Sequence, residues 1–161
     1  MFTGIVIPAD EALPLEKLEV HGIQDMQKAV GGLFEVLDTQ EPAASVWSNE
    51  EGLILDLPVN RRASILLWLG NKAHRGYTTL RGDCLVTGNP DDQGQTTSVS
   101  PELLALFFDT ESIKFEVQTA DSGTAWSSNQ QRFDNYFDAA AAALSLSGRW
   151  FLVTAMRVVP A

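Results

Sequence analysis

The sequence predicts an α+β fold, with a mixed β-sheet and about four helices in a single compact domain. Three observations support this prediction. Helical and strand-like apolar periodicities are interleaved along the 161 residues without a regular strand–helix–strand repeat. Hydrophobic residues make up 45% and charged residues 20% of the chain, as is ordinary for a globular protein. A chain of this length buries about 70% of its extended surface, which is enough for a core without disulfides or metals.

Glycine and proline divide the first part of the chain into short elements. Ile23, Met26 and Val30 recur at helical spacing and are followed by the Gly31-Gly32 pair, which predicts a helix that ends there. The elements expected in this region are strands over residues 3–8 and 33–37, an extended piece within 9–20, a helix over 23–30 and a turn over 38–42.

A β-hairpin is expected next. Two extended pieces, residues 44–47 and 53–57, flank a polar connector that ends in Gly52. This composition is typical of a hairpin loop, and Pro58 would end the second strand.

A helix with a well-defined start is expected after the hairpin. Asn60 is placed to cap a helix over residues 61–69, because an asparagine side chain can accept a hydrogen bond from a first-turn amide. Gly70 is the expected stop. A loop over 71–82, a strand over 83–87 and a turn-rich segment over 88–99 follow.

The remaining chain predicts two helices and two strands. Ser100-Pro101-Glu102 combines a hydroxyl cap, a first-turn proline and an early carboxylate, so a helix should run to residue 108. The other expected elements are a half-buried strand over 113–117, a loop over 119–129, a helix over 130–146 ended by Gly148, and a strand over 150–159. We expect residues 1–108 to form an α+β domain, with 109–161 as a strand–helix–strand extension packed on the same core.

Charge is distributed unevenly along this acidic chain, whose net charge is −10. Residues 61–82 hold five basic residues and no acid, whereas residues 1–60 hold 11 acids and two bases. The overall charge argues against coating DNA, because neutralising phosphates requires lysine and arginine. The basic segment is either a counterweight to the acidic flanks or a patch that binds an anion or a partner.

Recognisable catalytic motifs are absent from the sequence. It contains no phosphate-binding glycine loop, no nucleophile elbow and no metal-ligand spacing around His21 or His74, so no cofactor or metal is expected. His74 lies in the basic segment, where its protonated form could help to bind an anion. Cys84 is the only cysteine and is expected to be a small buried core residue.

The start of the helix after Asn60 is the most informative group of residues. Arg61 and Arg62 stand where unpaired amides already carry a partial positive charge, so something must compensate for them. Either the carboxylates of Glu50, Glu51 or Asp56 pair with them, or an anionic ligand does. The expected binding residues are Asn49, Glu50, Asn60, Arg61, Arg62, Lys72, His74, Arg75 and Arg81.

Four segments carry a resemblance to a known family. They are the helix, double glycine and strand at 26–36, the Asn49-Glu50-Glu51-Gly52 run with Leu57-Pro58-Val59-Asn60-Arg61, the Arg81–Gly88 strand, and the Ser100–Phe108 helix. In this order they resemble the domain of unknown function 3846 over residues 3–108. Residues 109–161 resemble an extension carried by some actinobacterial and phage members. The resemblance implies a gene of phages, plasmids or integrated elements, and it carries over no catalytic residue.

The leading functional hypothesis is a non-catalytic binding protein of a phage or mobile genetic element. It would bind a host protein or a small anionic ligand and so modulate host physiology or defence. The chain lacks a signal pattern and a bilayer-spanning apolar run, so the bacterial cytoplasm is the expected compartment. Direct nucleic-acid binding and membrane association are not expected, and the last helix and strand are compatible with a homodimer.

Two alternatives belong to other functional classes. One is an acidic inhibitor that mimics DNA toward a nucleic-acid enzyme, whose binding would be sensitive to salt. The other is a small enzyme with a pocket around Glu50, Asp56, Arg61 and His74.

Overall fold

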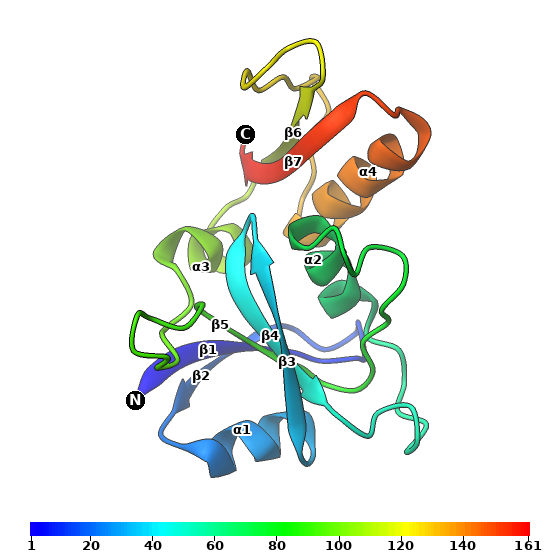
Figure 1. Ribbon diagram of the computed structural model, residues 1–161. Helices are drawn as coiled ribbons and strands as arrows, with labels where there is room; N and C mark the ends of the chain where they lie inside the picture. The colour runs from blue at the N-terminus through cyan, green and yellow to red at the C-terminus, as the bar shows by residue number, and fades with distance from the viewer. The chain divides into compact units, whose positions relative to one another are not determined.

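The computed structural model describes residues 1–161 and confirms the α+β class, with four helices and seven strands in two sheets (Figure 1). The chain divides into two compact units, residues 1–100 and 101–161, which are described separately below. The expectation that residues 109–161 pack on the core of 1–108 stays a prediction.

The first unit is built on a five-stranded sheet with the order β2-β1-β5-β4-β3. Its strands are β1 (Phe2–Ile7), β2 (Glu16–Val20), β3 (Phe34–Gln40), β4 (Ala43–Asn49) and β5 (Cys84–Thr87). Every ladder in it is antiparallel, so the expectation of a mixed sheet is wrong. The reason is that β1 with β2 and β3 with β4 pair directly along the chain, so no helix serves as a crossover between parallel strands.

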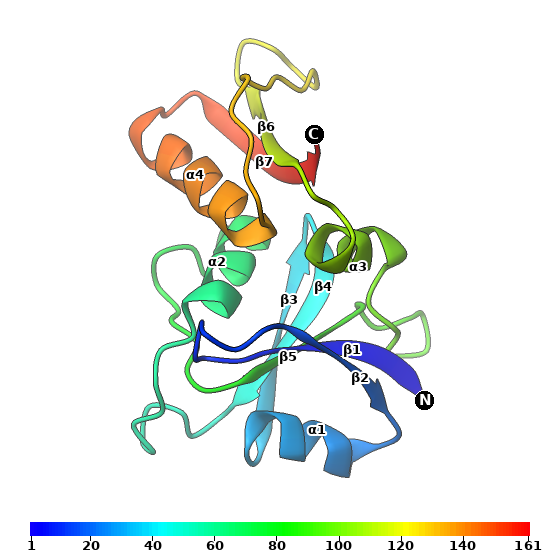
Figure 2. The same ribbon diagram turned by 180° about the vertical axis from the view of Figure 1, so that it is seen from behind.

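Helix α1 (Ile23–Val30) has the bounds that the sequence predicted, and it covers one face of this sheet (Figure 2). Its Met26 and Val30 pack with Val20 of β2 and Leu85 of β5 in a buried cluster. Gly31 ends the helix in the left-handed conformation, with φ of 80°, which glycine adopts without strain.

Helix α2 (Arg61–Gly70) lies against the opposite face, where it contacts β3 and β4. Phe34 packs on the α1 side, whereas Thr39, five residues along the same strand, meets Gly70 of α2. Because successive side chains of a strand alternate between faces, the two helices sandwich the sheet. A methyl group on Gly70 would collide with Thr39, so this glycine permits the close approach of α2 to the sheet.

The predicted hairpin at residues 44–57 is wrong in its second strand. Strand β4 is present, but it pairs with β3 on one side and with β5 on the other, so both of its edges are occupied. Residues 53–57 therefore have no strand to pair with, and residues 51–56 form successive turns. Strand β3 is also longer than expected and takes in residues 38–40, which the sequence assigned to a turn.

One backbone group at the free edge of β3 is covered. The Glu50 N–H donates to the Leu33 carbonyl, which fixes the hydrogen-bonding pattern of the β3–β4 ladder. In that pattern the carbonyl of Asp38 points away from β4. The side-chain amide of Asn71, which follows α2, donates to this carbonyl at 2.8 Å.

The second unit contains α3 (Pro101–Phe108), the two-stranded antiparallel sheet of β6 (Ile113–Thr119) and β7 (Val153–Pro160), and α4 (Tyr136–Arg149). Helix α4 packs on both strands. The Phe107 ring of α3 packs against Tyr136 and Phe137 of α4, with centroids 4.9 and 5.4 Å apart.

The predicted boundaries of the last helix need correction. The helix was expected over 130–146, but it begins at Tyr136, because the Asn135 side chain accepts a hydrogen bond from Asp138 N–H. Phe133 instead exchanges backbone hydrogen bonds with Ile113 of β6. Gly148 lies inside the helix and does not end it.

No helix in either unit is both long enough and apolar enough to cross a bilayer.

Candidate functional site

The arginines at the start of α2 are engaged within the first unit. Arg61 forms a bidentate ion pair with Glu11, with nitrogen–oxygen distances of 2.8 to 3.2 Å. This pairing lowers the pKa of the Glu11 carboxyl below its usual value. Arg62 donates to the backbone carbonyls of Pro8, Asp10 and Leu13, and so holds the loop between β1 and β2.

The other basic residues face different segments. Arg75 donates to the carbonyls of Trp68 and Leu69 near the end of α2, at 2.7 and 3.1 Å. Arg81 donates to the Leu57 carbonyl at 3.0 Å, and one of its nitrogens lies 3.8 Å from an Asp56 carboxylate oxygen. His74 Nδ1 lies 2.6 Å from Thr78 Oγ1, and Lys72 is exposed.

These contacts give the basic segment a structural role. Arg61 and Arg62 both hold the loop between β1 and β2, whereas Arg75 holds the end of α2 and Arg81 holds the loop before α2. The structure does not bring the four guanidinium groups together around one opening. Burial also lowers the pKa values of Arg62 and Arg75, as expected for cations inserted between backbone segments.

The two asparagines predicted as site residues serve the backbone. Asn60 is fully buried, and its side-chain oxygen accepts from Ala63 N–H, which confirms the predicted cap. Its side-chain nitrogen donates to the carbonyls of Ile7 and Gly82 at 2.8 and 2.9 Å. Asn49 donates to the Val30 carbonyl and accepts from Glu51 N–H.

A cavity of about 270 Å³ lies at the C-terminal end of α1. Residues from α1, the end of β4, the loop before α2 and the segment before β5 surround it. They are Lys28, Ala29, Val30, Gly31, Asn49, Leu55, Leu57, Pro58, Gly82 and Asp83. Three of the four segments that carry the family resemblance, within residues 26–36, 49–61 and 81–88, thus meet here, although they are far apart in the sequence.

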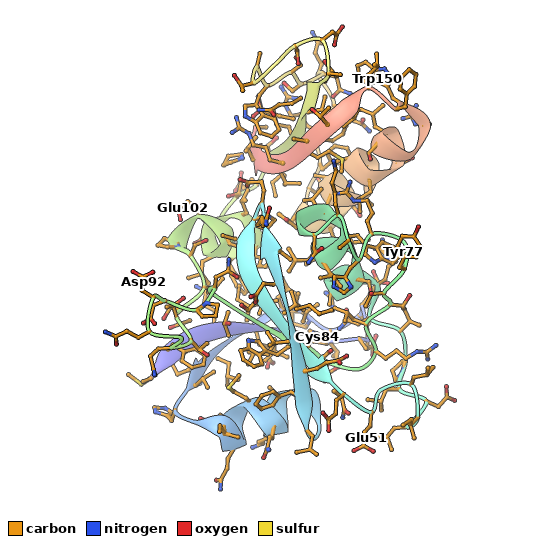
Figure 3. All side chains as sticks on the ribbon, viewed as in Figure 1. Glu51, Tyr77, Cys84, Asp92, Glu102 and Trp150 are labelled. Carbon is orange, nitrogen blue, oxygen red and sulfur yellow. The ribbon has the colours of Figure 1, made fainter.

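The loop between β4 and α2 presents an unusual surface beside this cavity. Leu53, Ile54 and Leu55 are 75%, 82% and 54% exposed, and we call these three residues the apolar tip. In Figures 1 and 2 the loop stands clear of the helices and strands of the first unit. Figure 3 labels Glu51, which begins it. Leu55 belongs both to the apolar tip and to the cavity wall.

Local hydrogen bonds hold this loop in shape. Leu55 N–H donates to Glu51, Asp56 N–H to Leu53 and Leu57 N–H to Gly52, at 2.8 to 3.1 Å. Asp56 adopts a φ of 51°, which an aspartate tolerates better than most residues do. The apolar tip is therefore presented in a defined conformation.

The four residues of the enzyme hypothesis lie in separate settings. Arg61 is paired with Glu11, and His74 contacts Thr78. Asp56 has a side chain 97% exposed, and Glu50 is also exposed. None of the four lines the cavity at the end of α1.

Cys84 is fully buried in β5, as expected. Burial, with a smaller contribution from the charge of Asp83, raises the pKa of its thiol to about 12. A thiol with this pKa is a poor nucleophile at neutral pH, because the thiolate is the reactive form.

The sequence interpretation did not identify the apolar tip as a site, and it did not include Gly82 and Asp83, which line the cavity, among the expected binding residues. A signal for the apolar tip was present, since three consecutive aliphatic residues stand between acidic ones at 50–56. That run was interpreted as a strand. The lining residues gave no local signal, because only the fold brings them beside α1.

The first unit is a small α+β fold in which three of the segments that carry the resemblance surround this cavity. The family model of the domain of unknown function DUF3846 matches residues 2–112, and the chain belongs to this family. Neither the curated proteins nor the solved structures contain a match to the chain.

Proposed function

We propose that this protein is a non-catalytic binding protein that recognises a partner protein through the apolar tip. The observation that carries the proposal is the high exposure of Leu53, Ile54 and Leu55 on a hydrogen-bonded loop. Contiguous exposed aliphatic residues on an ordered surface are a frequent mark of protein–protein contact.

Burial of the apolar tip would supply substantial binding energy. Fully burying a leucine or isoleucine side chain contributes about 1.5–3 kcal/mol. A few such residues at the centre of an interface commonly dominate its affinity. Because the loop is already ordered by its own hydrogen bonds, little conformational entropy would be lost on binding.

The charges around the apolar tip indicate the chemistry of the partner. Glu50, Glu51 and Asp56 border it and are exposed. A complementary surface would be an apolar pocket with a basic rim, and the net charge of −10 would accelerate association with it.

The family resemblance adds a genomic setting to this proposal, because it implies a gene of phages, plasmids or integrated elements. We propose that the partner is a host protein in the bacterial cytoplasm. The small anionic ligand and the enzyme pocket find less support, because the arginines expected to serve them are engaged with backbone carbonyls and carboxylates.

The test compares capture by two matched variants. Ile54→Asp places a charge on the apolar tip, and Tyr77→Asp does the same at another exposed site in the first unit, where Tyr77 is 87% exposed. Both variants should fold, since neither side chain is buried. Partners are captured from bacterial lysate with each variant and identified by mass spectrometry.

We expect a protein that is retained by the wild type and by Tyr77→Asp and lost by Ile54→Asp. Retention of the same proteins by all three would contradict a role for the apolar tip. A loss with both variants would show an electrostatic effect unrelated to it. A partner that is a nucleic-acid enzyme, bound independently of Ile54 and released by salt, would instead support the DNA-mimic alternative.

A further inference from the structure

We propose that the cavity at the end of α1 receives an arginine side chain of the partner protein. This inference rests on the proposed function, because it assigns the ligand of the cavity that adjoins the apolar tip. A partner segment that covered Leu55 would lie over the mouth of the cavity, since Leu55 belongs to both.

The first argument is the set of hydrogen-bond acceptors left at the end of α1. The carbonyls of the last turn have no partners within the helix. Of these, the Gln27 carbonyl accepts from Gly32 N–H and the Val30 carbonyl from Asn49 Nδ2. The carbonyls of Lys28 and Ala29 are not used in this way, and both residues line the cavity.

The second argument is electrostatic. A helix C-terminus carries a partial negative charge from the aligned peptide dipoles, and the carbonyls point along the axis toward the cavity. Asp83 adds a full negative charge to the lining, and one of its carboxylate oxygens already accepts from Ala9 N–H at 2.9 Å. That bond holds one oxygen of the carboxylate, and Asp83 is exposed, so its second oxygen is accessible to a ligand.

The third argument is the shape and polarity of the remaining wall. Leu55, Leu57 and Pro58 supply an apolar part of the lining. A guanidinium suits such a site, because its edge donates several hydrogen bonds in a plane and its faces are weakly hydrated. The alkyl stem of an arginine would cover the apolar side chains.

Lys28 is the one cation in the lining, and it lies in the last turn of α1. Its positive charge repels an incoming cation that is attracted by the C-terminus of α1 and by Asp83. Removing this charge should therefore strengthen binding of arginine, whereas removing the charge of Asp83 should weaken it.

The experiment uses the full chain and a defined probe. N-acetyl-arginine-N-methylamide is titrated into the 15N-labelled protein and followed by amide NMR shifts. The citrulline analogue is the matched probe, since it has nearly the same shape without the charge. The variants are Asp83→Asn, Lys28→Gln and, as a control acid outside the cavity, Asp92→Asn, labelled in Figure 3.

We expect saturable shifts at Gly31 and Gly82, with binding of the citrulline probe about tenfold weaker, as loss of a charge-assisted contact implies. Asp83→Asn should weaken binding several-fold, Lys28→Gln should strengthen it, and Asp92→Asn should leave it unchanged. Asp83→Asn keeps an oxygen for the Ala9 N–H, so its fold should be retained.

Three outcomes would overturn the inference: no saturable shift at these glycines, equal binding of both probes, or an equal response of Asp83→Asn and Asp92→Asn. Any of these would leave the proposed function standing if Ile54→Asp still abolished partner capture. Conversely, the probe could bind the cavity while partner capture is unaffected by Ile54→Asp. That result would support the cavity as an arginine site and contradict the proposed role of the apolar tip.

Discussion

Asn60 is a small polar side chain in the interior of the first unit that joins three segments of the chain. It caps α2 through its oxygen and donates to Ile7 and Gly82 through its nitrogen. Alanine would remove a cap worth about 1 kcal/mol and two hydrogen bonds to buried carbonyls, worth about 1 kcal/mol each. We expect Asn60→Ala to lower the free energy of unfolding by about 3 kcal/mol in a urea titration.

The control for this prediction is Asn60→Asp. Aspartate keeps the cap but turns an oxygen toward the two carbonyls, so the loss should be at least as large as for alanine. If Asn60→Asp were as stable as the wild type, the two donated bonds would contribute little.

The sequence revealed part of this role and part of the surrounding site. The cap could be predicted because it depends on residues three apart. The bonds to Ile7 and Gly82 could not, since they join residues 53 and 22 positions away. The same limit applies to Arg61, Arg62, Arg75 and Arg81. Their clustering along the chain was visible, but the separate directions of their side chains depend on the fold.

Two glycines differ in the space available for a side chain. A methyl group on Gly88, just after β5, would overlap Thr97 Oγ1 and the Ser98 carbonyl oxygen, whereas Gly148 in α4 has open space around it. We expect Gly88→Ala to cost about 2 kcal/mol through overpacking, and Gly148→Ala to gain about 0.5 kcal/mol through helix propensity.

The measurement is urea unfolding of both variants beside the wild type. Equal effects of the two substitutions would contradict the close approach at Gly88. A loss of stability in Gly148→Ala would show that α4 does not continue through that residue.

Local signals predicted some element boundaries and missed others: the glycine stop expected at Gly148 failed, and the cap from Asn135 was not predicted. Gly31 ended α1, and Asn60 began α2, because capping is local. Residues 53–57 were misjudged because their apolar character suits a strand, while the sheet offers no edge for one beside β4. The start of α4 was misjudged because Phe133 pairs with Ile113, a contact that helical spacing cannot reveal.

The acidic character of the whole molecule affects its stability. A net charge of −10 on 161 residues produces self-repulsion that unfolding relieves. Salt shortens the Debye length from about 30 Å at 0.01 M to about 8 Å at 0.15 M and screens this repulsion. The same salt weakens exposed ion pairs such as Arg61–Glu11, but each of these pairs contributes at most about 1 kcal/mol. We expect the removal of repulsion to be the larger effect on stability.

We therefore expect the midpoint of thermal unfolding to rise over that range of sodium chloride. Calorimetry at fixed pH provides the measurement. A midpoint that falls with salt would show that the ion pairs outweigh the repulsion.

At the scale of the molecule, composition and interleaved periodicities were sufficient for the α+β class, and four short motifs were sufficient for the family. The antiparallel character of the sheet was not predicted, because strand direction depends on which elements become neighbours.

The bond from Asn71 to the Asp38 carbonyl has a consequence for how copies of this protein meet. An outermost strand with unoccupied acceptors is a template on which further chains can stack into fibrils. Here an amide from the same chain occupies one of these acceptors, so an incoming strand would have to displace it before pairing past that point. This hydrogen bond therefore opposes strand addition at the β3 edge of the sheet.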